Sequence, residues 1–490
     1  MDESQSSLSP IPTSTWADWK WLVLLFALVI PLRGWLLWNT EVMARDSVGF
    51  IRYALRFDEQ PWGEVLRSFD QHPGYSAAIW LVSVPVRAWA GGITPEAMQL
   101  SAQLVSALAA VLLLVPMYYL GKTLWDARVG FGGALLYQYL PLSGHHLSDG
   151  ISESLFVLWI ACGLLCALWA VQSGRLSWFA ACGAMTGLAY LTRPEGAIGL
   201  AAVALTLLAF QARTDWRQPW ARLVCQGFCL AAPALMIGAF YYVPVGKFTA
   251  KPSINGLVAM TATSADAQPV PPSPALRAQL WADSFIDIRS PLKRLLRGLW
   301  SLLAEVGYSL HYIGLIPLLI GLFRQGGVLH CARGSWVVTA YFCLHAAALL
   351  LLATSAGYLS DRHLMPLIML LCYLVMIGLL QIGAWAMNAQ VLVPKLSLGT
   401  RGTAFLPTVT GVALALLTLE IAGGLPHTLK PLHHNRAGNH AAGLWLAVVL
   451  ASIEAVLDGV DGWLARRTGL TSEFGARFDM ETDALLILVL

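Results

Sequence analysis

Charged residues are scarce in this sequence. Asp, Glu, Lys and Arg make up 12% of its 490 residues, about half of the roughly 25% that is usual in soluble globular proteins. Hydrophobic residues make up 57%, and the mean hydropathy is +0.63. A chain of this composition has too little polar surface to face water on all sides, which indicates a membrane protein. The net charge of +3 gives no support for a nucleic-acid partner.

The sequence also lacks closely paired cysteines. Its eight cysteines mostly lie inside apolar runs and include no C-x-x-C pair, so we interpret them as small buried hydrophobic residues rather than zinc ligands or disulfides. A secretory signal peptide is not expected either. The first twenty residues contain Asp2, Glu3 and Asp18 against a single basic residue, Lys20. The apolar run that follows exceeds signal length and has no small-residue cleavage site.

Long apolar runs predict an all-α polytopic membrane protein. A helix needs about 20 apolar residues to cross a bilayer. We predict about a dozen transmembrane helices, at 21–38, 98–119, 129–142, 152–172, 178–192, 196–210, 223–245, 307–323, 335–353, 364–385, 404–423 and 442–457. The apolar segment 75–89 is short and contains proline, so it either spans the membrane or lies along its outer surface.

Basic residues in short loops set the expected orientation. Lys and Arg favour the cytoplasmic side, and they recur in four loops, as Lys122 and Arg128, as Arg213, Arg217 and Arg222, as Arg324 and Arg333, and as Lys395 and Arg401. All four loops are cytoplasmic if the N-terminus is cytoplasmic and 75–89 does not cross. The same assignment places outside the residues 39–97, 143–151, 193–195, 246–306, 354–363 and 424–441. We expect a multi-pass protein of a bacterial inner membrane.

Charged and histidine side chains recur at the predicted outer ends of the helices. They include Asp46, Asp70, His72, His145, His146, Asp149, Glu153, Arg193, Glu195, Asp361, Arg362 and His363. Such residues are costly in lipid and tend to mark a site. The alternative is a set of solvated helix ends, with arginines that reach the interface. Because charged groups recur at every outer end, we favour a site.

Several short motifs in this set resemble the GT-C fold glycosyltransferases. The similarity is greatest to the bacterial polyprenyl-phosphate-sugar transferases related to protein mannosyltransferase and lipid A aminoarabinose transferase, and it covers residues 15–425. It rests on the order and spacing of Arg45-Asp46-Ser47, His72-Pro73-Gly74-Tyr75, Ser152-Glu153-Ser154-Leu155-Phe156, Thr192-Arg193-Pro194-Glu195-Gly196 and Asp361-Arg362-His363-Leu364-Met365-Pro366.

This resemblance implies transfer of a sugar from a polyprenyl-phosphate donor to an acceptor outside the cytoplasm. Asp46 is then the general base, or it orients the acceptor hydroxyl. Arg193 and Arg362 bind the donor phosphate, because a planar guanidinium matches two phosphate oxygens.

The remaining outer residues are assigned to substrate binding by the same resemblance. Asp149 or Glu153 holds a sugar hydroxyl or a metal ion, and His72 and Glu195 contribute to the sugar and acceptor site. Gly74 stands where many relatives have a second proline, and the first loop has one clear acid instead of an Asp-Glu pair. The acceptor and the metal requirement of this site therefore stay open.

Four aspartates form a second motif near the C-terminal end of the sequence. Asp458 and Asp461 have i,i+3 spacing and Asp479 and Asp483 have i,i+4 spacing, so each pair projects from one face of a helix. Apolar runs flank both pairs, which presents four carboxylates to one pocket at the membrane surface. Oxygen donors of this kind suit Mg²⁺ or Mn²⁺. The alternative, an acidic turn between two helices, is disfavoured by the match at eight fixed positions.

The full motif resembles the signature of CDP-alcohol phosphatidyltransferases, over residues 440–490. It runs Asp458-x-x-Asp461-Gly462-x-x-Ala465-Arg466-x8-Gly475-x3-Asp479-x3-Asp483. The resemblance implies that the first three aspartates bind a metal ion that holds the CDP diphosphate. Asp483 then contributes to the metal site and acts as base on the incoming alcohol.

The smaller residues of this motif are assigned to nucleotide binding. Gly462, Ala465 and Arg466 line the CDP pocket by resemblance, and Gly475 leaves room for the nucleotide to approach the backbone. The implied substrates are a CDP-alcohol or CDP-diacylglycerol and a membrane lipid, and a homodimer is compatible with the family.

The sequence thus predicts three parts. They are a GT-C-like domain at 1–425 with external loops at 39–97 and 246–306, a junction at 426–441, and a partial phosphatidyltransferase domain at 442–490. Because seven residues follow Asp483, we expect the second domain to be incomplete and sugar transfer to be the main activity. One alternative is that phosphatidyl transfer is the main activity. A transporter or scaffold is disfavoured, since we find no internal repeat and the charges lie at helix ends.

Overall fold

The fold is built from α-helices. The computed structural model describes residues 16–40, 44–213, 217–251, 291–325, 333–356, 359–391 and 409–429. The chain divides into two units, Met1–Leu432 and His433–Leu490, and all described residues belong to the first. These residues contain no strand. Their helices are α1 (Trp16–Asn39), α2 (Arg45–Glu59), α3 (Trp62–Ser68), α4 (Pro73–Ala90), α5 (Pro95–Leu112), α6 (Leu114–Leu124), α7 (Ala127–Tyr139), α8 (Pro141–His146), α9 (Glu153–Ser173), α10 (Leu176–Thr192), η2 (Pro194–Ala197), α11 (Ile198–Ala212), α12 (Trp220–Val245), α15 (Pro291–Ser309), α16 (Leu315–Gln325), α17 (Arg333–Ala356), η4 (Asp361–Leu364), α18 (Met365–Val391) and α19 (Val409–Leu429).

Eight helical segments in the described part of the chain are long and apolar enough to cross a membrane. They are Asp18–Asn39, Pro95–Leu124, Glu153–Ser173, Pro194–Ala212, Trp220–Val245, Gly334–Thr354, Asp361–Ala386 and Val409–Leu429. This confirms the predicted all-α, multi-pass fold, although not the predicted number of about a dozen spans. The apolar helices α7, α10 and α16 have 13, 17 and 11 residues. The predicted span at 442–457 lies outside the described residues.

The prediction of one continuous helix over 307–323 is wrong. Helix α15 ends at Ser309 and α16 begins at Leu315. Between them, His311 and Tyr312 have φ angles of 54° and 57°. Two consecutive residues in the left-handed region cannot continue a right-handed helix, and side chains with a Cβ rarely adopt this conformation. The apolar sequence of this stretch gives no sign of the break.

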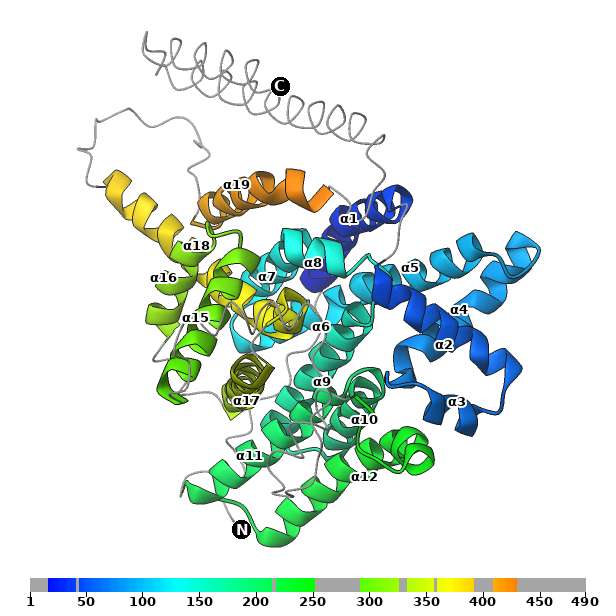
Figure 1. Cartoon of the computed structure of the whole chain (residues 1–490). Helices are drawn as coiled ribbons and strands as arrows, with labels where there is room; N and C mark the ends of the chain where they lie inside the picture. The colour runs from blue at the N-terminus through cyan, green and yellow to red at the C-terminus, as the bar shows by residue number, and fades with distance from the viewer. Residues whose placement is uncertain are drawn as a thin grey trace. The chain divides into compact units, whose positions relative to one another are not determined.

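The segment 75–89 forms α4, which is not among the eight candidate spans. Helices α2, α3 and α4 lie together beside α5 (Figure 1). Aromatic rings hold them to each other, with the Tyr53 and Phe69 ring centroids 4.2 Å apart and those of Phe57 and Trp62 4.5 Å apart. The predicted external loop 39–97 is therefore mainly a small helical layer with its own apolar clusters.

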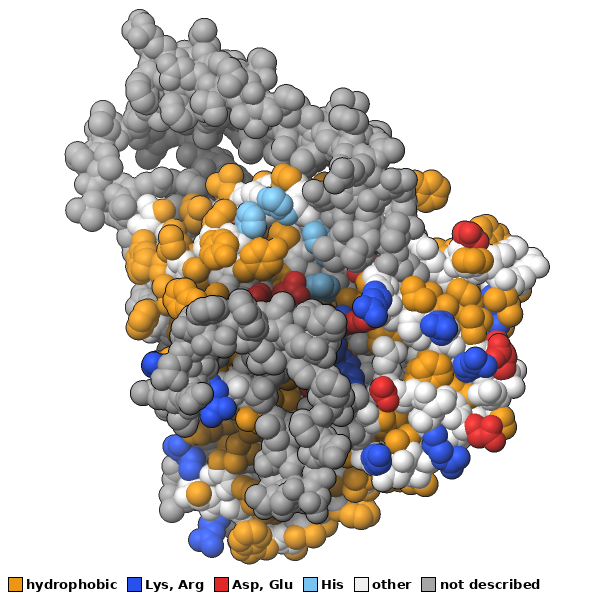
Figure 2. Space-filling model, viewed as in Figure 1, with side chains coloured by type: hydrophobic (Ala, Val, Ile, Leu, Met, Phe, Trp, Pro, Cys, Tyr) orange, Lys and Arg blue, Asp and Glu red, His pale blue; other side chains and the backbone are white. Residues whose placement is uncertain are grey.

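The distribution of surface side chains differs between this layer and the long helices. Figure 2 shows charged side chains gathered over α2, α3 and α4, and hydrophobic side chains over the helices on the opposite side of the view. Helix α12 exposes large apolar residues along its length, among them Phe228, Met236 and Phe240 with 71, 71 and 74% exposure. Such a contiguous apolar surface is expected where a helix faces lipid.

Close helix crossings in the bundle depend on small residues. A Cβ on Gly378 of α18 would meet the Pro317 backbone of α16, and a Cβ on Gly321 of α16 would meet the Leu374 backbone of α18. Because hydrocarbon tails are as apolar as leucine, helices in a membrane associate through such close packing. These contacts fix α18, whose N-terminal end carries the Asp361-Arg362-His363 turn.

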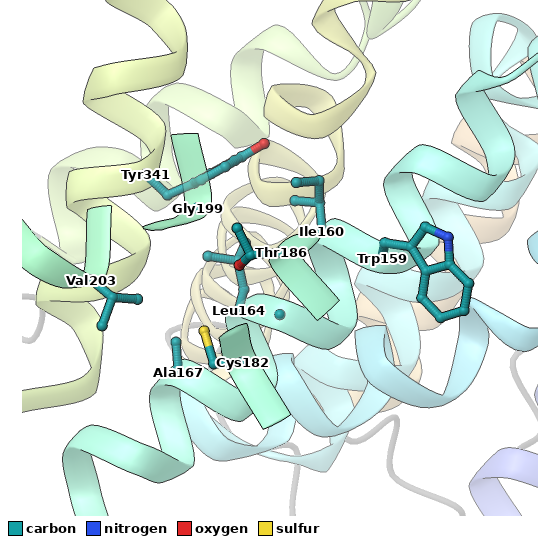
Figure 3. A pocket seen from close by; sticks show the side chains of 10 residues that line it. Trp159, Ile160, Leu164, Ala167, Cys182, Thr186, Gly199, Val203 and Tyr341 are labelled. Carbon is teal, nitrogen blue, oxygen red and sulfur yellow. The ribbon is translucent and has the colours of Figure 1, made fainter. Parts of the chain in front are cut away.

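Helices α9, α10, α11 and α17 enclose a small cavity of about 10 Å³ (Figure 3). It is lined by Trp159, Ile160, Gly163, Leu164, Ala167, Cys182, Thr186, Gly199, Val203 and Tyr341. A space of this size holds about one water molecule. This cavity is therefore too small to take a substrate.

Candidate functional site

Five charged residues of alternating sign meet at the ends of the helices, and we call them the charge chain. Asp46 lies 2.5 Å from Arg362, and Arg362 lies 3.8 Å from Glu153. Glu153 lies 2.5 Å from Arg193, which lies 3.5 Å from Glu195. Four distant parts of the sequence thereby converge, and all five residues were predicted to belong to one site.

The charge chain runs from a solvent-accessible end to a buried end. The side chains of Asp46 and Arg362 are 43 and 34% exposed, whereas those of Glu153 and Arg193 are 4 and 8% exposed. An ion pair in a low-dielectric interior is stronger than one in water, but only if both partners are present. The buried pair therefore suits a structural anchor, and the accessible pair suits contact with substrate.

Local sequence explains why these side chains lie at helix ends. Asp46 and Glu153 occupy the first turns of α2 and α9, where a carboxylate interacts favourably with the helix dipole. Arg193 follows the last residue of α10, and Pro194 cannot continue that helix. The backbone N–H of Arg193 still donates to Ala189 O at 2.8 Å, which holds Arg193 close to the helix.

The turn formed by η4 connects the charge chain to two further elements. Arg362 points into the charge chain, whereas Asp361 accepts a hydrogen bond at 2.7 Å from the backbone N–H of Arg362 and lies 3.3 Å from His146 Nε2 of α8. The carbonyl of His363 lies 3.2 Å from His345 Nε2 of α17. One short turn therefore links α2, α8, α9 and α17.

His72 lies beside the buried end of the charge chain with both ring nitrogens in use. Its Nδ1 lies 2.7 Å from Tyr190 O and its Nε2 lies 3.0 Å from Thr249 Oγ1. Because a carbonyl only accepts, Nδ1 carries the proton and Nε2 accepts from the Thr249 hydroxyl. Burial, together with the positive charge of Lys251, lowers the pKa of His72 to about 3. His72 is therefore neutral at physiological pH and positions the 249–251 segment.

Asp149 contacts the start of α2 through its backbone. It is 5% exposed, and its backbone carbonyl accepts a hydrogen bond from the Ser47 hydroxyl at 3.0 Å. This bond joins the start of α2 to the loop between α8 and α9. Asp149 thus helps to place Ser47 and, through the backbone of α2, the adjacent Asp46.

Two residues near the site were not predicted from the sequence. Arg33 of α1 is 2% exposed and donates to the Gln138 side chain and carbonyl, to Gly144 O at 2.8 Å and to Ser148 Oγ at 2.9 Å. The sequence signal that could have identified it is a basic residue inside an apolar run. Lys251 is the second. Burial lowers its pKa, and the negative charge of Glu195 opposes that shift.

Metal binding is not indicated in the part of the chain that the structure describes. No three His, Cys, Asp or Glu side chains are placed there to hold a metal ion. The residues predicted for the C-terminal metal and CDP sites lie outside the described residues, namely Asp458, Asp461, Gly462, Ala465, Arg466, Gly475, Asp479 and Asp483.

Two segments of the chain match models of known protein families. Residues 96–237 match the dolichyl-phosphate-mannose-protein mannosyltransferases, and residues 418–490 match the CDP-alcohol phosphatidyltransferases. Both resemblances predicted from the sequence are confirmed over these residues. The first segment contains Glu153 and Arg193, and the second begins within α19 and contains the four aspartates. No curated protein sequence matches the chain.

Three solved structures are similar to the chain at low sequence identity. An oligosaccharyltransferase of Archaeoglobus fulgidus in the apo form has a TM-score of 0.48 and 14% identity, over 86% of this chain and 57% of that one. The archaeal oligosaccharyltransferase AglB from the same organism, in complex with an inhibitory peptide and a dolichol-phosphate, has a TM-score of 0.48 and 13% identity, over 85% of this chain and 56% of that one. ArnT from Cupriavidus metallidurans bound to undecaprenyl phosphate has a TM-score of 0.49 and 16% identity, over 84% of this chain and 74% of that one. The chain spans little more than half the length of the two archaeal chains.

The environment of His72 predicts an acid-dependent loss of stability. The unfolded chain protonates this histidine near its ordinary pKa of 6.5, whereas the folded chain does so only near about 3. The contribution of His72 is therefore complete above pH 6.5 and is lost as the pH falls toward 3. We expect the apparent melting temperature in detergent to fall less between pH 7.5 and pH 5 in His72→Asn than in the wild type.

The control for this measurement is His427→Asn, because His427 is an exposed histidine of α19. The melting temperature of His427→Asn should change with pH as much as that of the wild type. Equal slopes for His72→Asn and the wild type would contradict the assigned environment of His72.

Proposed function

We propose that this chain transfers a sugar from a polyprenyl-phosphate donor to an acceptor hydroxyl at the charge chain. The observation that carries the proposal is the convergence of Asp46, Arg362, Glu153, Arg193 and Glu195 at the ends of apolar helices. Ionisable groups at membrane depth are costly and tend to be kept for function. The match of residues 96–237 to a mannosyltransferase family supports the same reaction class.

Asp46 is assigned as the base. It is the most exposed carboxylate of the charge chain, and its partner Arg362 is also accessible. The acceptor hydroxyl gives its proton to Asp46 and its oxygen forms the new bond to the sugar C1. The bond between C1 and the phosphate oxygen breaks, and the electron pair leaves with the polyprenyl phosphate.

Arg362 is assigned to binding the leaving phosphate, and Arg193 is assigned to positioning Arg362. Arg362 is accessible and lies between the carboxylates of Asp46 and Glu153. A guanidinium in this place stabilises the negative charge that grows on the phosphate. Arg193 is buried against Glu153, so it acts mainly by fixing the carboxylate that orients Arg362. Sugar hydroxyls are assigned to Glu195, with Asp149 and His72 in supporting positions.

The proposal includes an outward orientation of the charge chain. Lys122, one of the loop residues expected in the cytoplasm, pairs with Asp18 at 2.6 Å near the start of α1. Asp46 follows the other end of α1 in the sequence. The positive-inside preference then supports a cytoplasmic N-terminus and an external charge chain, in a bacterial inner membrane.

The base assignment is tested by Asp46→Asn, which keeps the size of the side chain and removes the carboxylate. In membranes supplied with a panel of polyprenyl-phosphate sugars, we expect kcat to fall by about 10²–10⁴ with little change in the donor KM. The matched control is Asp58→Asn in the same helix, where Asp58 pairs with Arg87 and Trp80 away from the charge chain. Full transfer activity in Asp46→Asn contradicts the assignment.

A second activity is proposed for the C-terminal segment, because residues 418–490 match the CDP-alcohol phosphatidyltransferases. Four carboxylates are a suitable donor set for Mg²⁺ or Mn²⁺, and a metal ion would neutralise the diphosphate of a CDP-alcohol or CDP-diacylglycerol. Asp458, Asp461 and Asp479 are assigned to this role. Asp483 takes the proton of the incoming alcohol as its oxygen bonds to phosphorus and CMP leaves.

This second proposal is tested by Asp479→Asn. We expect release of CMP from CDP-diacylglycerol, with Mg²⁺ and a panel of alcohols, to fall by at least about a hundredfold. Glu481→Gln is the control, since Glu481 is a neighbouring acid outside the motif. Asp46→Asn should leave CMP release unchanged, so the two activities are separable. CMP release that persists in Asp479→Asn contradicts the proposal.

A further inference from the structure

Arg33 is a buried arginine within a helix that is long and apolar enough to cross the membrane. It belongs to the candidate span Asp18–Asn39, and its side chain packs into the bundle formed with α7 and α8 (Figure 1). A charged group at this depth is costly and tends to have a specific task. The hydrogen bonds that Arg33 donates in the described part of the chain all end on neutral oxygen atoms, so they identify what it holds.

One side of the guanidinium is fixed to α7. Its Nε donates to Gln138 Oε1 at 3.1 Å and its Nη2 donates to the Gln138 carbonyl at 3.0 Å. Gln138 is itself held, because its Nε2 donates to Ala110 O of α5 at 2.8 Å. Arg33 is therefore anchored to packed helices that do not belong to the charge chain.

The remaining terminal nitrogen of Arg33 fixes the end of α8. Nη1 donates to Gly144 O at 2.8 Å and to Ser148 Oγ at 2.9 Å. Gly144 lies in the last turn of α8, where carbonyl groups have no acceptor role left within the helix. Arg33 thus satisfies a carbonyl at this end of α8 and ties it to the loop that leads to α9.

This loop makes one contact with each side of the accessible ion pair of the charge chain. His146 Nε2 lies 3.3 Å from Asp361, the residue before the arginine of that pair. The carbonyl of Asp149 accepts from the hydroxyl of Ser47, the residue after its carboxylate, at 3.0 Å. The loop that Arg33 ties down therefore contacts the neighbours of both members of the pair.

The accessible pair needs such support. The side chains of Asp46 and Arg362 are 43 and 34% exposed, and ion pairs in contact with water contribute little to holding two side chains in one geometry. Transfer, however, requires the base and the phosphate-binding group at a defined separation. The geometry of the pair must therefore be set by the backbone segments that carry it.

We propose that Arg33 is a positioning residue of the transfer site. It ties the segment 144–149 to α7, and through this segment it sets the position of Asp46 relative to Arg362. The roles of Asp46 and Arg362 rest on the proposed sugar transfer, whereas the hold of Arg33 on the segment does not. A planar guanidinium can donate to both elements at once, and the single ammonium of a lysine cannot.

The first test measures backbone amide hydrogen exchange in the full-length chain in detergent. We expect peptides over 44–50, 143–151 and 361–364 to exchange at least about tenfold faster in Arg33→Met than in the wild type. The matched control is Lys122→Met, which removes the ion pair to Asp18 at 2.6 Å near the other end of α1. It should lower the melting temperature but leave exchange in these peptides unchanged. Wild-type exchange over 44–50 and 361–364 in Arg33→Met overturns the proposal.

The second test separates kcat from KM in sugar transfer. We expect kcat to fall by about 10–100-fold in Arg33→Met, with a change in the donor KM of less than about threefold, because Arg362 keeps its charge. Arg33→Lys keeps a positive charge but loses the fork, so its kcat should stay within about threefold of that of Arg33→Met. Wild-type kcat in Arg33→Lys contradicts the role assigned to the fork. So does a loss of kcat in Lys122→Met as large as in Arg33→Met.

The two tests fail independently of the proposed function. If neither the wild type nor any variant transfers sugar, the proposed function fails, and the exchange measurement alone decides whether Arg33 holds these segments. If Asp46→Asn abolishes transfer while Arg33→Met has the kcat of the wild type, sugar transfer stands and the positioning role of Arg33 is wrong.

Discussion

The buried ion pair between Glu153 and Arg193 is the contact on which the site depends. Its two side chains are almost inaccessible to water, so removal of either partner leaves a buried charge with only its longer contact, to Arg362 at 3.8 Å or to Glu195 at 3.5 Å, and lowers the stability of the fold. Glu153 opens α9, and Arg193 joins α10 to η2. Arg362 approaches the same carboxylate and brings η4 and Asp46 with it. One carboxylate therefore aligns elements that are far apart in the sequence.

The sequence allowed the membrane helices and the members of the charge chain to be predicted, because both leave a local signal. Apolar runs mark the spans, and charged residues at run ends mark the outer surface. The break at His311 and Tyr312 was not predictable, since a tyrosine rarely adopts the left-handed conformation and nothing in the local sequence marks it. Lys251 was missed because its proximity to Glu195 is a tertiary contact.

The two family matches cover separate segments of the chain. The mannosyltransferase match covers the helices that hold Glu153 and Arg193, and the phosphatidyltransferase match begins at residue 418, inside α19. In the proposed orientation the charge chain faces outward.

The most direct test of this account is a structure of the full chain with polyprenyl phosphate bound. The account predicts that the phosphate oxygens lie about 2.7–2.9 Å from the guanidinium of Arg362, with Asp46 released from that arginine and the Glu153–Arg193 pair intact. A phosphate bound away from Arg362, with the Asp46–Arg362 pair unchanged, would contradict it.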